Sequence, residues 1–204
     1  MSRIKEFGEV FTPLDKVERL IGLIEDEVIR VDSRFLEPAC GNGVVLDQIL
    51  KKRLKIVYQR YSRSQLEFER NAFKAIGNLY GVEILKDNVQ EARCRLESTL
   101  TDFYRLKFKS TYNDHFLSSV AYLINKNIIW GDFLSMTQMP DNKKGLEFSE
   151  WSFVKGSLVK RRDYIWSCSN NSMNCNPNSR SLNGDFRLIR DFVIMNFLEL
   201  GKYD

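Results

Sequence analysis

A glycine turn is the first feature of this sequence that can do chemistry. Gly41-Asn42-Gly43 follows the short apolar run Phe35-Leu36 and precedes a helical apolar pattern that begins at Val44. Backbone N–H groups converge in such a turn, and a helix N-terminus carries partial positive charge, so the pattern is typical of an anion-binding site. Leu46 stands where the third glycine of a dinucleotide fingerprint would be, which disfavours a nicotinamide dinucleotide as the ligand.

Two acidic residues follow later apolar runs and can hold the rest of a nucleoside. Glu83 is placed to accept hydrogen bonds from two ribose hydroxyls, with Ile84 lying flat against a purine. Asp132 can accept from an exocyclic amine, and Phe133 can form an apolar wall. Because ligands of parallel α/β sheets bind at the carboxyl ends of the strands, we expect these residues to converge on the glycine turn. The alternative is that both acids only cap helices.

Strands and helices that alternate along the chain must position these residues. Thr12 is expected to cap a helix, with Pro13 in its first position and Asp15 as a capping-box acid. The alternation predicts an α/β fold with a mostly parallel sheet flanked by helices. Apolar spacing predicts helices at 13–29, 44–54, 64–77, 86–109 and 113–124, and strands at 35–38, 79–84 and 127–130.

Beyond residue 134 the pattern changes to antiparallel strands. The runs 146–154 and 158–166 predict a C-terminal hairpin. Residues 167–184 are rich in Asn and Ser and predict a polar loop. Residues 185–200 carry an apolar stripe that predicts a closing helix, although 192–195 also permits a strand.

Composition is typical of a globular protein. The 204 residues are 43% hydrophobic and 28% charged, and no stretch approaches the roughly 20 apolar residues that a membrane span needs. The four cysteines have no framework spacing and His115 is the only histidine, so we expect no metal site. The first residues have no apolar leader pattern. We therefore expect a reduced, cytoplasmic protein with no membrane partner.

Two basic segments can contact nucleic acid. Residues 51–74 hold eight basic residues against two acidic ones, which suits a phosphate backbone, although a solvated helix face is the alternative. Lys160-Arg161-Arg162 lies close in sequence to Trp151, Tyr164 and Trp166. Basic residues interleaved with aromatic ones are typical of surfaces that splay a nucleic-acid strand, whereas the alternative is an edge strand protected by charge.

Four ordered stretches resemble the cofactor motifs of the N6-adenine-specific DNA methyltransferases, in the group whose Phe-Thr-Pro motif precedes the glycine motif. The stretches are Gly8–Pro13, Phe35–Gly43, Tyr80–Ile84 and Trp130–Phe133, and they span about two thirds of the chain. The resemblance implies a Rossmann-like S-adenosylmethionine-dependent methyltransferase fold. It places the methyltransferase domain at 1–166, with the polar loop and C-terminal helix of 167–204 packed on the same domain.

The resemblance implies that S-adenosyl-L-methionine is the cofactor. Its carboxylate suits the helix N-terminus, and its sulfonium can be tolerated by Glu37 and the carbonyls of the turn. Glu83 would bind the ribose, and Asp132 would meet the adenine amino group. Ile84 and Phe133 would sandwich the adenine ring. Thr12 and Pro13 would flank the methionine moiety, with Glu37, Ala39, Gly41 and Gly43 around it. Phe11, Pro38 and Asn42 are the other residues expected to bind the cofactor.

The activity that the resemblance implies is methyl transfer to N6 of adenine in DNA. The transfer is an in-line displacement in which positioning is the main catalytic contribution. DNA is then the expected partner, as for a modification methylase. Either a specificity subunit or other partner protein reads the sequence, or the protein is poorly sequence-specific. The family's catalytic Asn-Pro-Pro-Tyr motif is missing, because all four prolines of this chain stand alone.

Three stretches can substitute for the missing catalytic motif. By order along the chain the first contains Glu150, which can accept from the target amine, and Trp151 or Phe153, which can stack on the base. The alternative for this stretch is an edge strand with buried aromatic residues. Asn176-Pro177-Asn178 reads as a turn, and 191–197 reads as part of the closing helix.

Other functions stay open at the level of sequence. The missing Pro-Pro pair favours a catalytically altered S-adenosylmethionine-binding subunit. An altered catalytic strand also permits a methyltransferase with a non-DNA substrate. A nucleotide-dependent oxidoreductase is the least favoured function.

Overall fold

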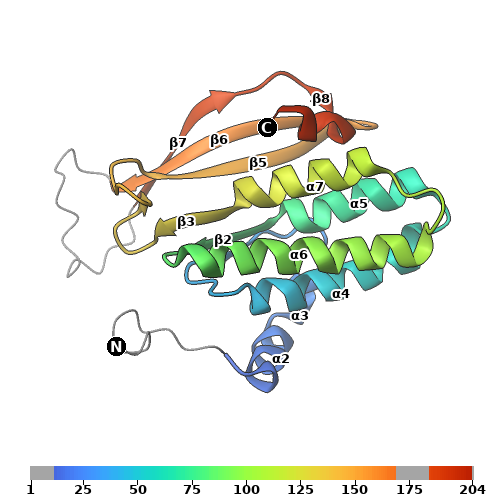
Figure 1. Cartoon of the computed structure of the whole chain (residues 1–204), viewed down its shortest axis with the longest axis horizontal. Coiled ribbons are helices and arrows are strands. Elements are labelled where there is room, and N and C mark those ends of the chain that lie inside the picture. The colour runs from blue at the N-terminus through green and yellow to red at the C-terminus, as the bar shows by residue number, and fades with distance from the viewer. Residues whose placement is uncertain (1–11, 169–183, 204) are drawn as a thin grey trace.

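The computed structural model describes residues 12–168 and 184–203 (Figure 1). The helices are α2 (Leu14–Leu23), α3 (Glu25–Val28), α4 (Val44–Tyr61), α5 (Gln65–Gly77), α6 (Lys86–Lys107), α7 (Asp114–Asn127) and the 3-10 helix η1 (Phe197–Tyr203). The strands are β1 (Phe35–Glu37), β2 (Leu79–Glu83), β3 (Ile128–Asp132), β4 (Thr137–Gln138), β5 (Leu146–Lys155), β6 (Leu158–Cys168), β7 (Gly184–Asp191) and β8 (Met195–Asn196).

A mixed sheet with the order β1-β2-β3-β4 forms the centre of the molecule. Leu36 pairs with Tyr80, and Glu83 pairs with Trp130, in two parallel ladders. The short β4 adds an antiparallel edge. The predicted strands at 35–38, 79–84 and 127–130 are confirmed, and so is the α/β class. The carboxyl ends of β1, β2 and β3 therefore meet at one edge of the sheet.

Strand β2 is buried on both faces, as expected of a central parallel strand. Leu79 packs in the cluster formed with the helices, and a Cβ at Gly81 would come within 3.1 Å of Leu46 on α4. Tyr80 and Val82 point the other way and pack in a second cluster with residues of β5. Helices thus cover one face of β2, and the antiparallel sheet covers the other.

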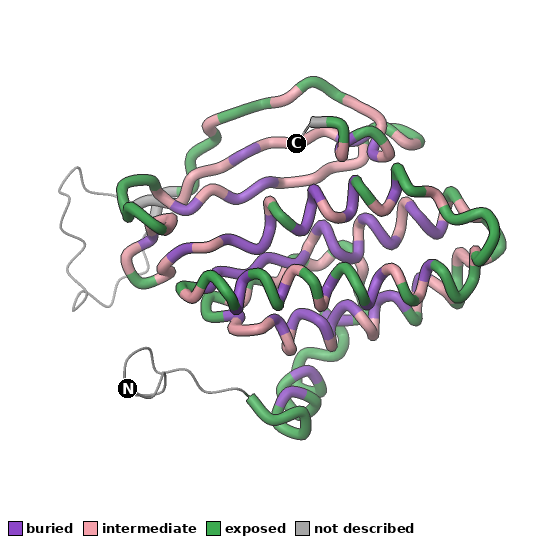
Figure 2. Tube along the Cα trace, in the orientation of Figure 1, coloured by how far each residue is buried: buried purple, intermediate pink, exposed green. Residues whose placement is uncertain are grey.

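Helices α4 to α7 lie side by side, and each turns a buried stripe inward (Figures 1 and 2). Ser64 begins α5 by accepting a hydrogen bond from the N–H of Glu67, 3.4 Å away, which is the main half of a capping box. Asn113 caps α7 by accepting from the N–H of His115 at 3.0 Å. These local interactions explain why the helices predicted at 44–54, 64–77, 86–109 and 113–124 are confirmed, with α4 extending seven residues further than expected to Tyr61.

The predicted hairpin is confirmed as β5 and β6, and it belongs to a larger antiparallel sheet of order β5-β6-β7 with β8 paired to β6. The closing helix predicted at 185–200 is wrong. Phe186 and Leu188 pair in register with Trp166 and Tyr164 on β6, and the chain turns into η1 only at Phe197. Phe186 contacts the rings of Tyr164 and Trp166 on β6, and these cross-strand contacts favour the sheet. The spacing of apolar residues within 185–200 cannot reveal contacts with another segment, so it predicted a helix.

The helix predicted at 13–29 is also wrong, because two helices replace it. Ile24 has a φ of −123°, which ends α2 before α3 begins. Pro13 is the N-cap residue of α2, and no side chain caps this helix, so Thr12 does not have the expected capping role. Figure 2 shows α2 largely exposed, with only Val17 and Ile21 buried.

Among the residues that the structure describes, no helix combines the length and the apolar character that crossing a bilayer demands.

Candidate functional site

The glycine turn joins β1 to α4, and its two glycines have different roles. Both have a positive φ, +51° at Gly41 and +80° at Gly43, which L side chains rarely adopt. A Cβ at Gly43 would lie 2.9 Å from the Cβ of Ala92, so Gly43 allows α6 to pack against the turn. A Cβ at Gly41 would meet open space. Gly41 is therefore the glycine that leaves the turn accessible to a ligand.

The carboxylate of Glu83 lies directly against this turn. Its Oε2 accepts a hydrogen bond from the N–H of Gly41, and its Oε1 accepts from the N–H of Leu85, both at 2.8 Å. Only 7% of Glu83 is exposed. An ionised carboxylate has about four lone-pair sites, so two acceptor positions remain for ligand hydroxyls.

A small hollow of about 70 Å³ opens in front of the turn. We call it the turn hollow, and its wall contains Thr12, Glu37, Ala39, Cys40, Gly41, Asn42, Val44 and Val45. Five of these residues (Thr12, Glu37, Ala39, Gly41 and Asn42) were expected to bind the cofactor, and the fold brings them together from the start of α2, the end of β1 and the turn itself. The first N–H groups of α4 have no carbonyl of a preceding helical turn to bond, so they can receive an anion here.

Burial raises the pKa of both ionisable groups in the turn hollow. Desolvation raises the pKa of Glu37 above 4.5, and a backbone hydrogen bond from Ala39 partly opposes it. Desolvation, with the negative charges of Glu83 and Glu37, raises the pKa of the Cys40 thiol to about 12. Cys40 therefore stays protonated at neutral pH and is not a nucleophile, while Glu37 is disposed to accept a neighbouring positive charge.

The residues expected around the adenine do not line the turn hollow. Asp132 accepts a hydrogen bond from the N–H of Leu134 at 2.9 Å, which makes a local turn after β3. Ile84 is 38% exposed beside Glu83. Phe133 packs edge-on against Trp166, with ring centroids 5.3 Å apart, on the face of the sheet covered by β5. The geometry thus gathers the methionine-side residues more completely than the adenine-side ones.

Three further expected residues complete the comparison with the sequence. Pro13 and Pro38 are exposed at the two chain segments that border the turn hollow, and Gly43 is buried against α6. Phe11 lies outside the described residues, as does Asn176-Pro177-Asn178.

Strand alternation separates the three residues expected to replace the catalytic motif. The indole N–H of Trp151 donates to Oδ1 of Asn127 at 3.0 Å, and its ring packs edge-on against Phe73. Phe153 also packs edge-on against Phe73. Both aromatic rings therefore belong to the packing between β5 and the helices, as the alternative of buried strand aromatics predicts, and neither faces Glu150.

Glu150 lines a separate aromatic cavity of about 400 Å³. Its carboxylate forms an ion pair with Arg34, accepts from the hydroxyl of Tyr164 at 3.2 Å and lies 3.6 Å from Nη1 of Arg162. The aromatic cavity and the turn hollow have no lining residue in common. Glu150 is thus engaged in an ion-pair network away from the glycine turn.

Several basic side chains of the block at 51–74 are buried or form ion pairs within the fold. Arg53 is fully buried, and its guanidinium donates to the carbonyls of Val28 at 3.2 Å and Ala75 at 3.0 Å. Burial lowers the pKa of Arg53 to about 10. Lys51 and Lys52 form ion pairs with Asp47 and Glu25. The triplet at 160–162 is similarly paired with Asp163, Asp191 and Glu150.

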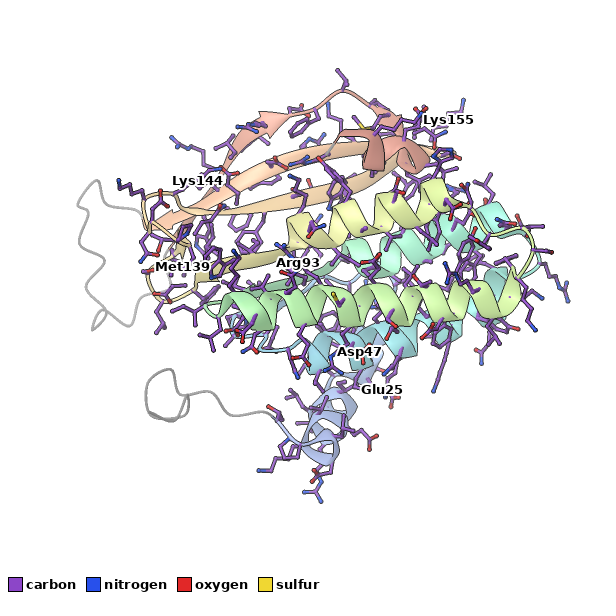
Figure 3. All side chains as sticks on the ribbon, in the orientation of Figure 1. Glu25, Asp47, Arg93, Met139, Lys144 and Lys155 are labelled. Carbon is purple, nitrogen blue, oxygen red and sulfur yellow. The ribbon has the colours of Figure 1, made fainter. Side chains whose placement is uncertain are left out.

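A second cavity, which is basic and has a volume of about 360 Å³, was not predicted from the sequence. Its cations come from α6, α7, β6, β7 and the loop before β5, so no contiguous segment indicates it. Arg93 and Lys144, labelled in Figure 3, mark its two sides.

Within the described ranges no cluster of three or more His, Cys, Asp or Glu side chains could hold a metal ion. His115 is exposed at the start of α7.

Compared with known protein families, with curated proteins and with solved structures, the chain gives no significant match in any of the three.

Proposed function

We propose that this chain binds S-adenosylmethionine at the carboxyl edge of β1, β2 and β3, in a Rossmann-like methyltransferase architecture. The observation that carries the proposal is the contact between Glu83, at the end of β2, and the N–H of Gly41, in the turn that follows β1. It places an acidic acceptor, an open glycine and a helix N-terminus at one point of a parallel sheet. That combination suits a nucleoside joined to an anionic group.

The residues of this site match the chemical parts of the cofactor. The N-terminus of α4 can receive the methionine carboxylate, and Glu37 can neutralise the sulfonium. The free lone pairs of Glu83 can accept from ribose hydroxyls. The turn hollow of about 70 Å³ is well below the roughly 300 Å³ of a complete ligand site, so it takes only the methionine end, and the adenosine end lies along Glu83 and Ile84. When bound, the cofactor supplies an activated methyl group.

The same geometry favours a cofactor-binding subunit of a DNA adenine methylase over a self-sufficient enzyme. Trp151 and Phe153 are committed to packing, and Glu150 is committed to an ion-pair network. Orientation of the target amine then falls to a partner chain, which also reads the DNA sequence. An active methylase of adenine N6 in DNA, or of a non-DNA amine, is the second candidate, and the resemblance of the cofactor motifs favours it.

Titration calorimetry with S-adenosylmethionine and with S-adenosylhomocysteine tests the binding proposal. We expect both to bind and to raise the melting temperature, because linkage stabilises the state that binds the ligand. We expect Glu37→Gln to weaken binding of the sulfonium compound more than that of the neutral thioether. Absence of heat and of any thermal shift with both compounds would overturn the proposal.

Transfer of labelled methyl groups to unmethylated DNA separates the two candidates. The cofactor-binding subunit is expected to bind S-adenosylmethionine and to transfer no label by itself. Transfer by the isolated chain that is lost in Asp132→Ala would identify it as the enzyme instead.

A further inference from the structure

The basic cavity lies where α6 and α7 approach β3, the loop after it and the antiparallel sheet. Figure 3 shows Arg93 on the helix side and Lys144 and Met139 on the loop side. Its volume of about 360 Å³ falls within the roughly 300–1,000 Å³ range of small-ligand sites. Its charged lining residues are Arg93, Lys126, Lys144, Glu147, Arg161, Asp163 and Arg190.

The two carboxylates of the basic cavity are each neutralised by a cation of the same wall. Nζ of Lys144 lies 2.9 Å from Oε1 of Glu147. Arg161 donates to both oxygens of Asp163, at 2.7 and 2.6 Å, in the bidentate arrangement that suits a guanidinium. The carboxylates therefore have no spare charge with which to neutralise the other cations.

Three cations of the wall remain without a carboxylate. In residues 12–168 and 184–203, no acidic side chain forms an ion pair with Arg93, Lys126 or Arg190. Lys126 is half-buried, with Nζ 5.1 Å from the centroid of the Tyr122 ring, and Arg190 is exposed at the rim. Three uncompensated positive charges around one polar concavity attract an anion more strongly than scattered surface lysines do.

Arg93 is held in place by the backbone. Its Nε and Nη2 donate to the carbonyl of Ile128 at 3.1 and 2.6 Å, and Nη2 also donates to the carbonyl of Asn125 at 3.1 Å. No partner in the described ranges accepts from Nη1. The guanidinium is thus positioned before any ligand arrives, and a donor is left over for it.

We propose that the basic cavity binds a phosphate group. A carboxylate ligand would compensate one of the three free cations, whereas a phosphate brings up to two charges and several acceptor oxygens. The polar walls disfavour an apolar ligand. Phosphodiesters of a nucleic-acid strand and a free phosphate compound offer the same chemistry, and both fit the cavity.

The phosphate site and the proposed cofactor site can be tested separately. The basic cavity and the turn hollow have no lining residue in common. Failure of one proposal therefore leaves the other standing, and each has its own variants.

The test uses Lys126 and Arg190, whose side chains make no hydrogen bond or ion pair in the described ranges, so that the substitutions preserve the fold. In Lys126→Gln/Arg190→Gln both substituted residues line the cavity. The matched control is Lys107→Gln/Arg63→Gln, in which Lys107 likewise lies over a tyrosine ring and Arg63 is exposed. Both variants lose the same net charge.

Pyrophosphate and a labelled single-stranded oligonucleotide are the probes. We expect the cavity variant to bind the preferred probe about tenfold or more weakly, while the control variant binds like the wild type. For the oligonucleotide, the slope of log affinity against log salt should become shallower by about 1.4 in the cavity variant, because two cations that neutralise phosphates of a single strand are lost. Equal affinities in both variants, or no binding of either probe to the wild type, would overturn the proposal.

The two probes also distinguish the sources of the phosphate. Oligonucleotide binding that pyrophosphate displaces assigns the cavity to a nucleic-acid backbone. Pyrophosphate binding with no oligonucleotide binding assigns it to a free phosphate compound. Titration of S-adenosylmethionine should give the same affinity in the cavity variant as in the wild type.

Discussion

The carboxylate of Glu83 accepts a hydrogen bond from the N–H of Gly41 at 2.8 Å, and this contact links the end of β2 to the glycine turn that follows β1. The other carboxylate oxygen accepts a hydrogen bond from the N–H of Leu85, the residue just before α6. One acidic side chain thus fixes the glycine turn and the helix start together. Glu83 does not cap α6, because Leu85 is the N-cap residue of this helix and no side chain caps it. The remaining lone pairs of the carboxylate can still accept from a ligand.

Removal of the Glu83 carboxylate should destabilise the fold as well as the site. Glu83→Ala leaves two N–H groups without their acceptor, and each such loss costs about 1–3 kcal/mol. Glu83→Gln keeps one acceptor oxygen and should cost less. Urea unfolding followed by circular dichroism measures both. Equal stability of Glu83→Ala and the wild type would contradict the structural role.

The two glycines of the turn should respond differently to alanine. Gly41→Ala should cost about 1–2 kcal/mol, because only the positive φ opposes the new methyl group. Gly43→Ala should cost about 1–3 kcal/mol more, because its Cβ would also overlap Ala92. Thermal unfolding of the two variants makes the comparison, and a Gly41→Ala variant less stable than Gly43→Ala would be inconsistent with this packing.

Glu37 should make stability fall with rising pH. Its pKa in the folded state is raised above 4.5, so the native state holds the proton more firmly than the unfolded state does. That stabilisation is complete below about pH 4.5 and is lost as the pH rises through the raised pKa. Glu37→Gln should therefore be more stable than the wild type at neutral pH and similar to it in acid.

Urea unfolding of Glu37→Gln across this pH range is the measurement. Glu97→Gln, on the exposed side of α6, controls for the loss of one negative charge. A Glu37→Gln variant with the same pH dependence as the wild type would show that burial of Glu37 carries no such cost.

Arg53 should matter for stability and not for nucleic-acid binding. Arg53→Ala removes the donors to the carbonyls of Val28 and Ala75 and empties a buried volume, so we expect a loss on the order of 3 kcal/mol or more. Arg53→Lys keeps the charge without the planar fork and should recover part of the loss. Lys52→Ala, by contrast, should leave stability nearly unchanged, because both partners of its ion pair with Glu25 are solvent-accessible. Chemical denaturation of the three variants tests this ranking, and an innocuous Arg53→Ala would reject it.

Local sequence determined the framework that carries the candidate site. The alternation of strands and helices between residues 35 and 132 follows from apolar periodicity, from the cap at Ser64 and from the glycines of the turn, all of which act within a few residues. The same motifs place Glu37 and Glu83 at the ends of strands and Gly41 in the turn directly after β1. Since parallel strands end at one edge, their proximity follows almost directly.

Tertiary structure decided what depends on partners distant in sequence. The segment predicted as a helix at 185–200 forms β7 because β6 offers an antiparallel edge and aromatic neighbours for Phe186. Arg53 reads as a surface cation, but the carbonyls of α3 and α5 and the surrounding core bury it. The basic cavity collects Arg93, Lys126 and Arg190 from three elements. Periodicity records only which side of an element is apolar, whereas strand pairing, burial of charge and convergence of cations depend on which elements meet.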